Sequence, residues 1–103
     1  QPHRFTRTRD FMNEFATAFN ASDVVLVSDI YAASEEPIEG ISAESLTENI
    51  SLYGHGDVNS SGDLDTTLER LLKVVQPGDL VITLGAGSIY RVGERLLERL
   101  GEG

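Results

Sequence analysis

The sequence predicts an α/β fold: an open, mostly parallel sheet with helices on both faces. Two segments, DVVLVSDIY (23–31) and DLVITLGAG (79–87), carry continuous apolar runs, which are typical of strands buried on both faces of a parallel sheet. Helical patterns alternate with these segments, and such alternation implies right-handed crossovers between parallel strands. The 103 residues, of which 40% are hydrophobic, are enough for one domain (1–103) with a modest core.

Periodicity and turn residues define the other elements of the first half. Aromatic residues recur at helical spacing after the N-terminus, and Thr6 or Thr8 can cap the helix they predict. Ser42 is a candidate cap for a second, shorter helix. The expected order is a helix over about 8–20, the strand over 24–27, a loop over 35–40, a helix from Ser42 to about Ile50, a weak strand over 51–58 and a turn over 59–62.

Two amphipathic helices are expected in the second half. The first ends at Pro77-Gly78, and an i,i+4 pair between Glu69 and Lys73 would support it. The second follows the glycine turn that ends the strand over 79–87. Their apolar stripes are Leu68, Leu71, Leu72 and Val75 in the first helix, and Ile89, Val92, Leu96 and Leu100 in the second.

The distribution of charge excludes some classes of partner. The net charge is −9, and residues 10–69 hold thirteen acidic side chains and no Lys or Arg, whereas residues 1–9 hold three arginines and no acid. A field this negative repels phosphate backbones, so nucleic-acid binding is not expected. No apolar run approaches the roughly 18–20 residues that span a bilayer, a signal-peptide pattern is absent, and there is no Cys. We therefore expect a cytoplasmic protein that does not bind membranes.

The beginning of the chain departs from the expected alternation. QPHR (1–4) leads directly into a helix, without the strand that an α/β order would put before it. We interpret the chain as a fragment of a longer protein from which the first strand is missing. The parent chain would then cover the bare sheet edge or apolar surface left behind.

Three motifs carry a resemblance to a known family. QPHRFTRTRDF (1–11), DIYAASEEPIEGIS (29–42) and GDLVITLGAGSIYRVG (78–93) resemble the C-terminal domain of the Mur ligases, which has a Rossmann-like fold. Within that family the match is to the members that add L-alanine to UDP-N-acetylmuramate, with the murein peptide ligase as nearest sibling. One departure is Ser34, where the family often has glycine.

The resemblance implies an ATP-dependent amide ligation in bacterial peptidoglycan synthesis. ATP with Mg²⁺ would activate the muramate carboxylate as an acyl phosphate, which the amine of L-alanine attacks. The missing N-terminal and central domains would hold the UDP sugar, the phosphates and most metal ligands. This domain would close over ATP and the amino acid, excluding water, and would be inactive alone. The sequence agrees, because it contains no phosphate-binding G-x-x-x-x-G-K-[ST] loop.

The resemblance also indicates binding residues beside the first predicted helix. His3, Arg4 and Arg7 lie at its start, where free N–H groups and arginine geometry favour an anion. That anion would be the carboxylate of the incoming amino acid or a phosphate. Judged without the motif, the three residues are better explained as solvated terminal charges beside an acidic body.

A second group of candidates follows the first buried strand, where open α/β sheets bind ligands. Tyr31, Ala33 and Glu35 belong to it: Tyr31 would wall the alanine pocket, and Glu35 would orient the ammonium group or a cationic neighbour. The alternative is a tyrosine packed on the sheet end among solvated acids. Gly85 and Gly87 form a third place, a structural turn that allows close approach of a nucleotide or another domain.

Other function classes remain open at this point. Asp29 follows a buried strand as the phosphoacceptor of receiver domains does, but the lysine that receivers place after the last buried strand is absent from LGAGS (84–88). An interaction domain without catalytic role is a further alternative. We expect no metal ligands, and we expect His55, between two glycines, to be an exposed loop residue.

Overall fold

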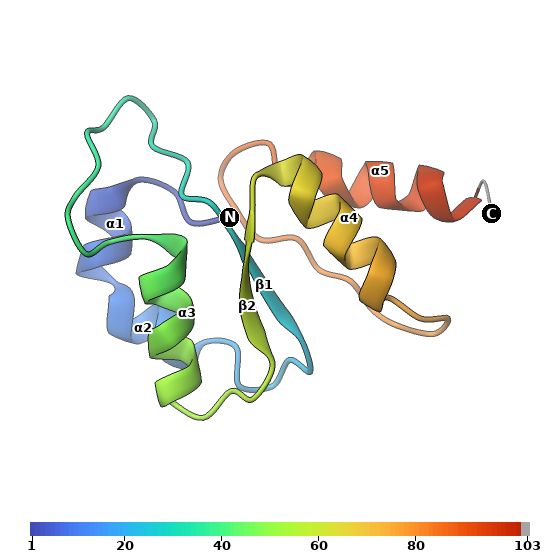
Figure 1. The fold of residues 1–103 in the computed structure, drawn as a ribbon, viewed down its shortest axis with the longest axis horizontal. Helices are drawn as coiled ribbons and strands as arrows, with labels where there is room; N and C mark the ends of the chain where they lie inside the picture. Colours follow the sequence, from blue (N-terminus) through green and yellow to red (C-terminus); the bar gives the residue numbers. More distant parts are fainter. Residues whose placement is uncertain (102–103) are drawn as a thin grey trace.

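The computed structural model describes residues 1–101 and shows an α/β arrangement around a short parallel sheet. Strands β1 and β2 pair in parallel, with Val25 opposite Val58 and an irregularity in register after Val27. Helices α1 to α3 lie on one side of this sheet and α4 and α5 on the other (Figure 1). The elements are α1 (Phe5–Asp10), α2 (Met12–Thr17), β1 (Val25–Ser28), α3 (Ala43–Leu52), β2 (Val58–Gly62), α4 (Leu64–Val74) and α5 (Tyr90–Gly101).

The first core lies between the sheet and helices α2 and α3. Val25 and Val27 of β1 pack with the buried face of α3, and the partly buried Phe15 and Phe19 pack against the same cluster. Helix α3 begins as predicted, because the Ser42 hydroxyl accepts from the Ser45 N–H at 3.0 Å while the Ser45 hydroxyl accepts from the Ser42 N–H at 2.9 Å. This reciprocal capping box satisfies two donors that a helix start otherwise leaves free. The buried members are Val25, Val27, Ala43, Leu46 and Ile50.

A second core joins α4 to α5. Leu68, Val92 and Leu96 are buried in it, as their helical spacing predicts, whereas Leu100 is half exposed. Two exposed ion pairs link the same helices: Arg95 to Asp65 at 2.6 Å and Arg99 to Glu69 at 3.0 Å. Within residues 1–101, Glu69 therefore pairs across helices, and the expected Glu69–Lys73 pair is not formed.

The first helix differs from the prediction in its bounds and its cap. It begins at Phe5 instead of Thr8, and it is interrupted at Phe11, which separates α1 from α2. Thr6 and Thr8 lie inside α1, so neither is the cap residue, and the Thr8 hydroxyl donates to the Arg4 carbonyl oxygen at 2.8 Å. The start of α1 is instead capped from a distant loop, as described below.

Residues 58–62 form β2, where the sequence predicted a weak strand ending at 58 and a turn. Pairing with the buried strand β1 overrides the low strand propensity of this Ser- and Asn-containing segment. Ser61 is buried, and its hydroxyl is satisfied at 2.7 Å by that of Thr67 on α4. A small polar strand is therefore stable here because its inward hydroxyl has a partner.

The predicted second buried strand is not a strand in the described residues. The segment 79–84 has no ladder partner among residues 1–101, and its apolar side chains Leu80, Ile82 and Leu84 are exposed. Its end meets the N-terminus of the chain, where the amino group of Gln1 donates to the Leu84 carbonyl oxygen at 2.8 Å. An apolar run predicts burial, but strand formation also needs a neighbouring strand to pair with.

His55 is buried, contrary to the expectation of an exposed loop residue. Its Nδ1 accepts from the Asp57 N–H at 3.0 Å, and its Nε2 lies 2.6 Å from the Ser22 carbonyl oxygen. Since Nδ1 is the acceptor, Nε2 carries the proton and donates to Ser22. The imidazole thus hydrogen-bonds the loop before β1 to the loop before β2. The two glycines that flank His55 in the sequence give no sign of these contacts.

Candidate functional site

The N-terminal segment lies along the loop that leaves β1. His3 and Tyr31 form a parallel bridge, in which the Arg4 N–H donates to the Tyr31 carbonyl oxygen at 2.7 Å and the Tyr31 N–H donates to that of Pro2 at 2.8 Å. The rings of His3 and Tyr31 stack with centroids 5.3 Å apart and 17° between their planes. Two separate groups of candidate residues are therefore in direct contact at the carboxyl end of β1.

Arg4 adopts a backbone conformation that is rare for a residue with a side chain. Its φ of 68° and ψ of 143° lie in a region that glycine favours. Both of its backbone groups are held, because its N–H donates to Tyr31 and its carbonyl oxygen accepts from the N–H and hydroxyl of Thr8. The guanidinium is exposed, as is that of Arg7 one helical turn later on α1.

Glu35 caps the start of α1 from thirty residues away. Its Oε1 accepts from the Phe5 N–H at 2.7 Å and from the Thr6 N–H at 3.2 Å, and its Oε2 accepts from the Thr6 hydroxyl at 2.5 Å. The hydrogen bond from the Thr6 hydroxyl is the main cause that lowers the pKa of Glu35, with the two N–H groups and the nearby Arg4 charge acting in the same direction. An internal carboxylate thus occupies the helix start, where the sequence analysis expected a substrate anion.

The turn before Glu35 requires left-handed backbone at two consecutive residues. Ala33 has φ 52° and Ser34 has φ 71°, values at which a Cβ is sterically costly. A glycine at position 34 would adopt this conformation without the strain that a Cβ adds. Ala33 lies two residues before Glu35, in this left-handed turn. Its methyl side chain has no polar group, so its contribution here is its backbone conformation.

Gly85 and Gly87 lie against the N-terminal segment because neither has a side chain. A Cβ on Gly85 would stand 2.7 Å from Ile89 Cγ2 and 3.2 Å from the Gln1 carbonyl oxygen. A Cβ on Gly87 would stand 3.3 Å from the Gln1 side-chain oxygen and 4.0 Å from Tyr31 Cγ. The backbone of the glycine turn therefore lies close to Gln1 and Tyr31. The close approach that the sequence predicted here is made to another segment of this chain.

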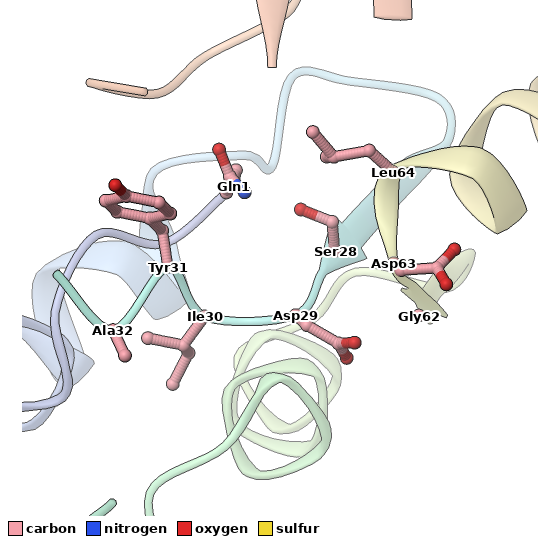
Figure 2. A pocket seen from close by; sticks show the side chains of 9 residues that line it. All are labelled: Gln1, Ser28, Asp29, Ile30, Tyr31, Ala32, Gly62, Asp63 and Leu64. Carbon is pink, nitrogen blue, oxygen red and sulfur yellow. The ribbon is translucent and has the colours of Figure 1, made fainter. Parts of the chain in front are cut away.

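A cavity of about 190 Å³ opens at the carboxyl ends of β1 and β2. Figure 2 shows the Ser28 hydroxyl and the Leu64 side chain pointing into it, while the carboxylates of Asp29 and Asp63 point away. Ser28 is 2% exposed, and its hydroxyl has no hydrogen-bond partner within residues 1–101. The lining residues are Gln1, Ser28, Asp29, Ile30, Tyr31, Ala32, Gly62, Asp63 and Leu64.

The cavity includes residues that sequence reasoning missed. Of the predicted binding residues only Tyr31 lines it, whereas His3, Arg4, Arg7 and Glu35 belong to the adjoining α1 side. Gly62 was missed because the segment that forms β2 was interpreted as a turn, and Leu64 was missed because it lies just beyond that turn, at the start of α4. Ser28 carried a usable signal, as the last residue of a buried strand in a sheet class that binds ligands there.

Within residues 1–101, no group of three or more His, Cys, Asp or Glu side chains is arranged to hold a metal ion. Over the same residues, no helix has both the length and the apolar character needed to cross a membrane.

Fold and site together define a domain of the α/β class whose candidate site lies at the carboxyl edge of parallel strands. Residues 1–87 match the family model described as Mur ligase, glutamate ligase domain. The chain belongs to the Mur ligase family and corresponds to its C-terminal domain.

Three curated relatives show how far the similarity extends. The chain is 54% identical over 97% of its length to the UDP-N-acetylmuramate--L-alanine ligases of Syntrophobacter fumaroxidans and Solibacter usitatus. It is 52% identical over 99% of its length to the enzyme of that name from Geobacter sulfurreducens. These alignments cover 21% to 22% of the relatives, so the chain spans about a fifth of their length.

Proposed function

We propose that this chain is the C-terminal domain of a bacterial ligase that joins L-alanine to UDP-N-acetylmuramate with ATP. The observation that carries the proposal is the 54% identity to relatives of that name over nearly the whole chain. The reaction is the formation of an amide bond to a small amino acid. Its substrate is a soluble nucleotide sugar, which suits an enzyme of the bacterial cytoplasm.

The part of this domain would be to bind and orient the amino acid. Arg4 and Arg7 present two exposed guanidinium groups from the start of α1, and such groups bind a carboxylate or phosphate in bidentate fashion. His3 and Tyr31, stacked beside them, would form one wall of the alanine site. Holding the amine in line with its target and excluding water both favour ligation over hydrolysis of the activated acid.

ATP and Mg²⁺ would be held mainly by the other domains of the longer protein. The sequence has no phosphate-binding loop, and residues 1–101 contain no acidic cluster for a metal ion. Those domains would also cover the exposed apolar side chains of Leu80, Ile82 and Leu84, the last of which lies beside Gln1. This proposal agrees with a chain that spans a fifth of the relatives.

Phosphate release by the full-length ligase that contains this domain tests the proposal. We expect release from ATP and Mg²⁺ only when both UDP-N-acetylmuramate and L-alanine are present. Release with a muramyl-linked tripeptide, and without L-alanine, would assign the chain to the murein peptide ligases instead. If no combination of these substrates releases phosphate, the proposal is wrong.

A matched pair of variants tests the site. Arg7→Ala is expected to raise the KM for L-alanine or ATP, because it removes a substrate-binding cation while leaving α1 intact. Arg9→Ala, two residues away on the same helix, removes an exposed arginine that is already paired with Asp10 at 2.9 Å, and we expect it to behave as the unmodified enzyme. Equal kinetics for the two variants would remove Arg7 from the site.

A further inference from the structure

Three of the roughly four acceptor positions of the Glu35 carboxylate are already used within the chain. Both carboxylate oxygens already accept hydrogen bonds from the first turn of α1, two from backbone N–H groups and one from the Thr6 hydroxyl. These are charge-assisted bonds, which are stronger than bonds between neutral groups. The carboxylate is only partly exposed, and its partners all belong to this chain.

The residue immediately before this cap is the one with the most demanding backbone. Arg4 precedes Phe5, whose N–H is bound by Glu35, and its own N–H and carbonyl oxygen are held by Tyr31 and Thr8. A conformation of this kind persists only where the surroundings determine it on both sides. The Glu35 carboxylate supplies the restraint on the C-terminal side of Arg4, and the pairing with Tyr31 supplies the one on the N-terminal side.

From this geometry we infer that Glu35 is a positioning residue: it fixes the start of α1 so that Arg4 and Arg7 present their guanidinium groups to the substrate. This inference rests on the proposed function of the two arginines. It differs from the sequence-based expectation, in which Glu35 contacts the substrate ammonium group directly. The distinguishing partner is Thr6, which a directly binding glutamate would not need.

Steady-state kinetics of the full-length ligase test the inference. For Glu35→Gln we expect kcat/KM for L-alanine to fall by about 10- to 100-fold, mainly through KM, because the binding groups are displaced and the reacting groups are not changed. For Thr6→Val we expect a fall of about 5- to 10-fold in the same parameter, from loss of one hydrogen bond to a charged group. In the double variant the loss should be no greater than for Glu35→Gln alone, since both changes break one interaction.

The chain offers controls for both substitutions. Thr6→Ser keeps the hydroxyl and should retain the kinetics of the unmodified enzyme, and Glu36→Gln changes an exposed neighbouring carboxylate and should do the same. Unchanged kinetics of Thr6→Val, with a loss for Glu35→Gln, would mean that Glu35 binds substrate directly and would overturn the inference. Equal behaviour of Glu35→Gln and Glu36→Gln would also overturn it. If Glu35→Gln does not fold, the comparison of Thr6→Val with Thr6→Ser decides.

Amide hydrogen exchange supplies a measurement that does not depend on ligase activity. In Glu35→Gln the peptide covering residues 1–11 should exchange faster at the Phe5 and Thr6 amides, while peptides from α4 and α5 keep the exchange of the unmodified enzyme. Unchanged exchange at those two amides would refute the positioning role. Faster exchange in an enzyme that releases no phosphate with L-alanine would instead leave the role intact and remove the proposed function.

Discussion

Replacing Arg4 by glycine should stabilise the fold, although it removes a side chain from the candidate site. Arg4 has φ 68° and ψ 143°, a region where residues with a Cβ are strained by about 1–3 kcal/mol. Glycine relieves this strain but loses about 0.5–1 kcal/mol through the greater freedom of its unfolded chain. The expected difference between Arg4→Gly and Arg4→Ala is therefore about 1 kcal/mol in favour of glycine, because alanine keeps the Cβ.

Urea unfolding of the 103-residue chain, followed by circular dichroism, measures this difference. A gain of about 1 kcal/mol corresponds to a rise of about 4–8 °C in Tm for a domain of this size. The same pair of substitutions at Arg9, inside α1, provides the control, since glycine there should be less stable than alanine by about 1 kcal/mol. The strain argument is refuted if Arg4→Gly is no more stable than Arg4→Ala. In the full-length ligase Arg4→Gly should lower activity despite its higher stability.

Three further predictions concern the core, a helix cap and pH. Leu68→Ala should lower the free energy of unfolding by about 2–5 kcal/mol in a urea titration, because this side chain is 1% exposed in the second core. Ser42→Ala should cost about 1 kcal/mol of the same quantity, and Ser42→Asp should retain most of it, because only the first removes the acceptor for Ser45. Folding lowers the pKa of Glu35 from 4.5. The ionised carboxylate therefore stabilises the fold fully above pH 4.5, and this stabilisation is lost as the pH falls through the lower pKa of the folded state. Glu35→Gln should accordingly make the free energy of unfolding depend less steeply on pH in acid.

Each of these predictions has an outcome that contradicts it. A loss below about 1 kcal/mol for Leu68→Ala would mean that α4 and α5 do not enclose this side chain as the structure shows. Equal stability of Ser42→Ala and Ser42→Asp would show that the cap contributes nothing. If Glu35→Gln loses stability with acid as steeply as Glu36→Gln does, the carboxylate is not held by α1.

Local signals made part of the fold predictable. The cap at Ser42 and the stripe that includes Leu68 depend on residues three or four positions apart, so the sequence contains all the information needed to find α3 and α4. The run over 24–27 is likewise a contiguous signal, and β1 lies within one residue of it. Elements of this kind can be predicted because the residues that determine them are close together in the sequence.

The elements that sequence reasoning misplaced are those whose partners lie far away. Helix α1 begins at Phe5 because of Glu35, and β2 forms because it pairs with β1, although neither partner is near in sequence. Residues 79–84 show the converse, since their apolar pattern has no paired strand within residues 1–101. A local pattern cannot report a contact that only the folded chain creates.

The same distinction applies to the candidate site. His3, Arg4, Tyr31 and Glu35 were found by motif, and the structure gathers them at one end of β1. The sequence could not predict that the Arg4 side chain faces solvent while the Glu35 carboxylate binds the start of α1, because this depends on which atoms Glu35 contacts. Ser28 had a sequence signal as the last residue of a buried strand, but the lack of a hydrogen-bond partner for its hydroxyl within residues 1–101 could be seen only in the structure.

The separation of the two cores has a consequence for cooperativity. The cluster around Ile50 and the cluster around Val92 share no buried residue, and the main packing partner of α5 among the helices and strands is α4. Sub-global opening follows such divisions, so the α4–α5 layer can detach while the layer built on α3 stays folded. The domain then behaves as two layers that open separately, and the cavity at the ends of β1 and β2 lies between them, because Leu64 of α4 lines it together with residues that follow β1. A ligand bound there would contact both layers and would therefore raise the protection of their backbone amides against hydrogen exchange.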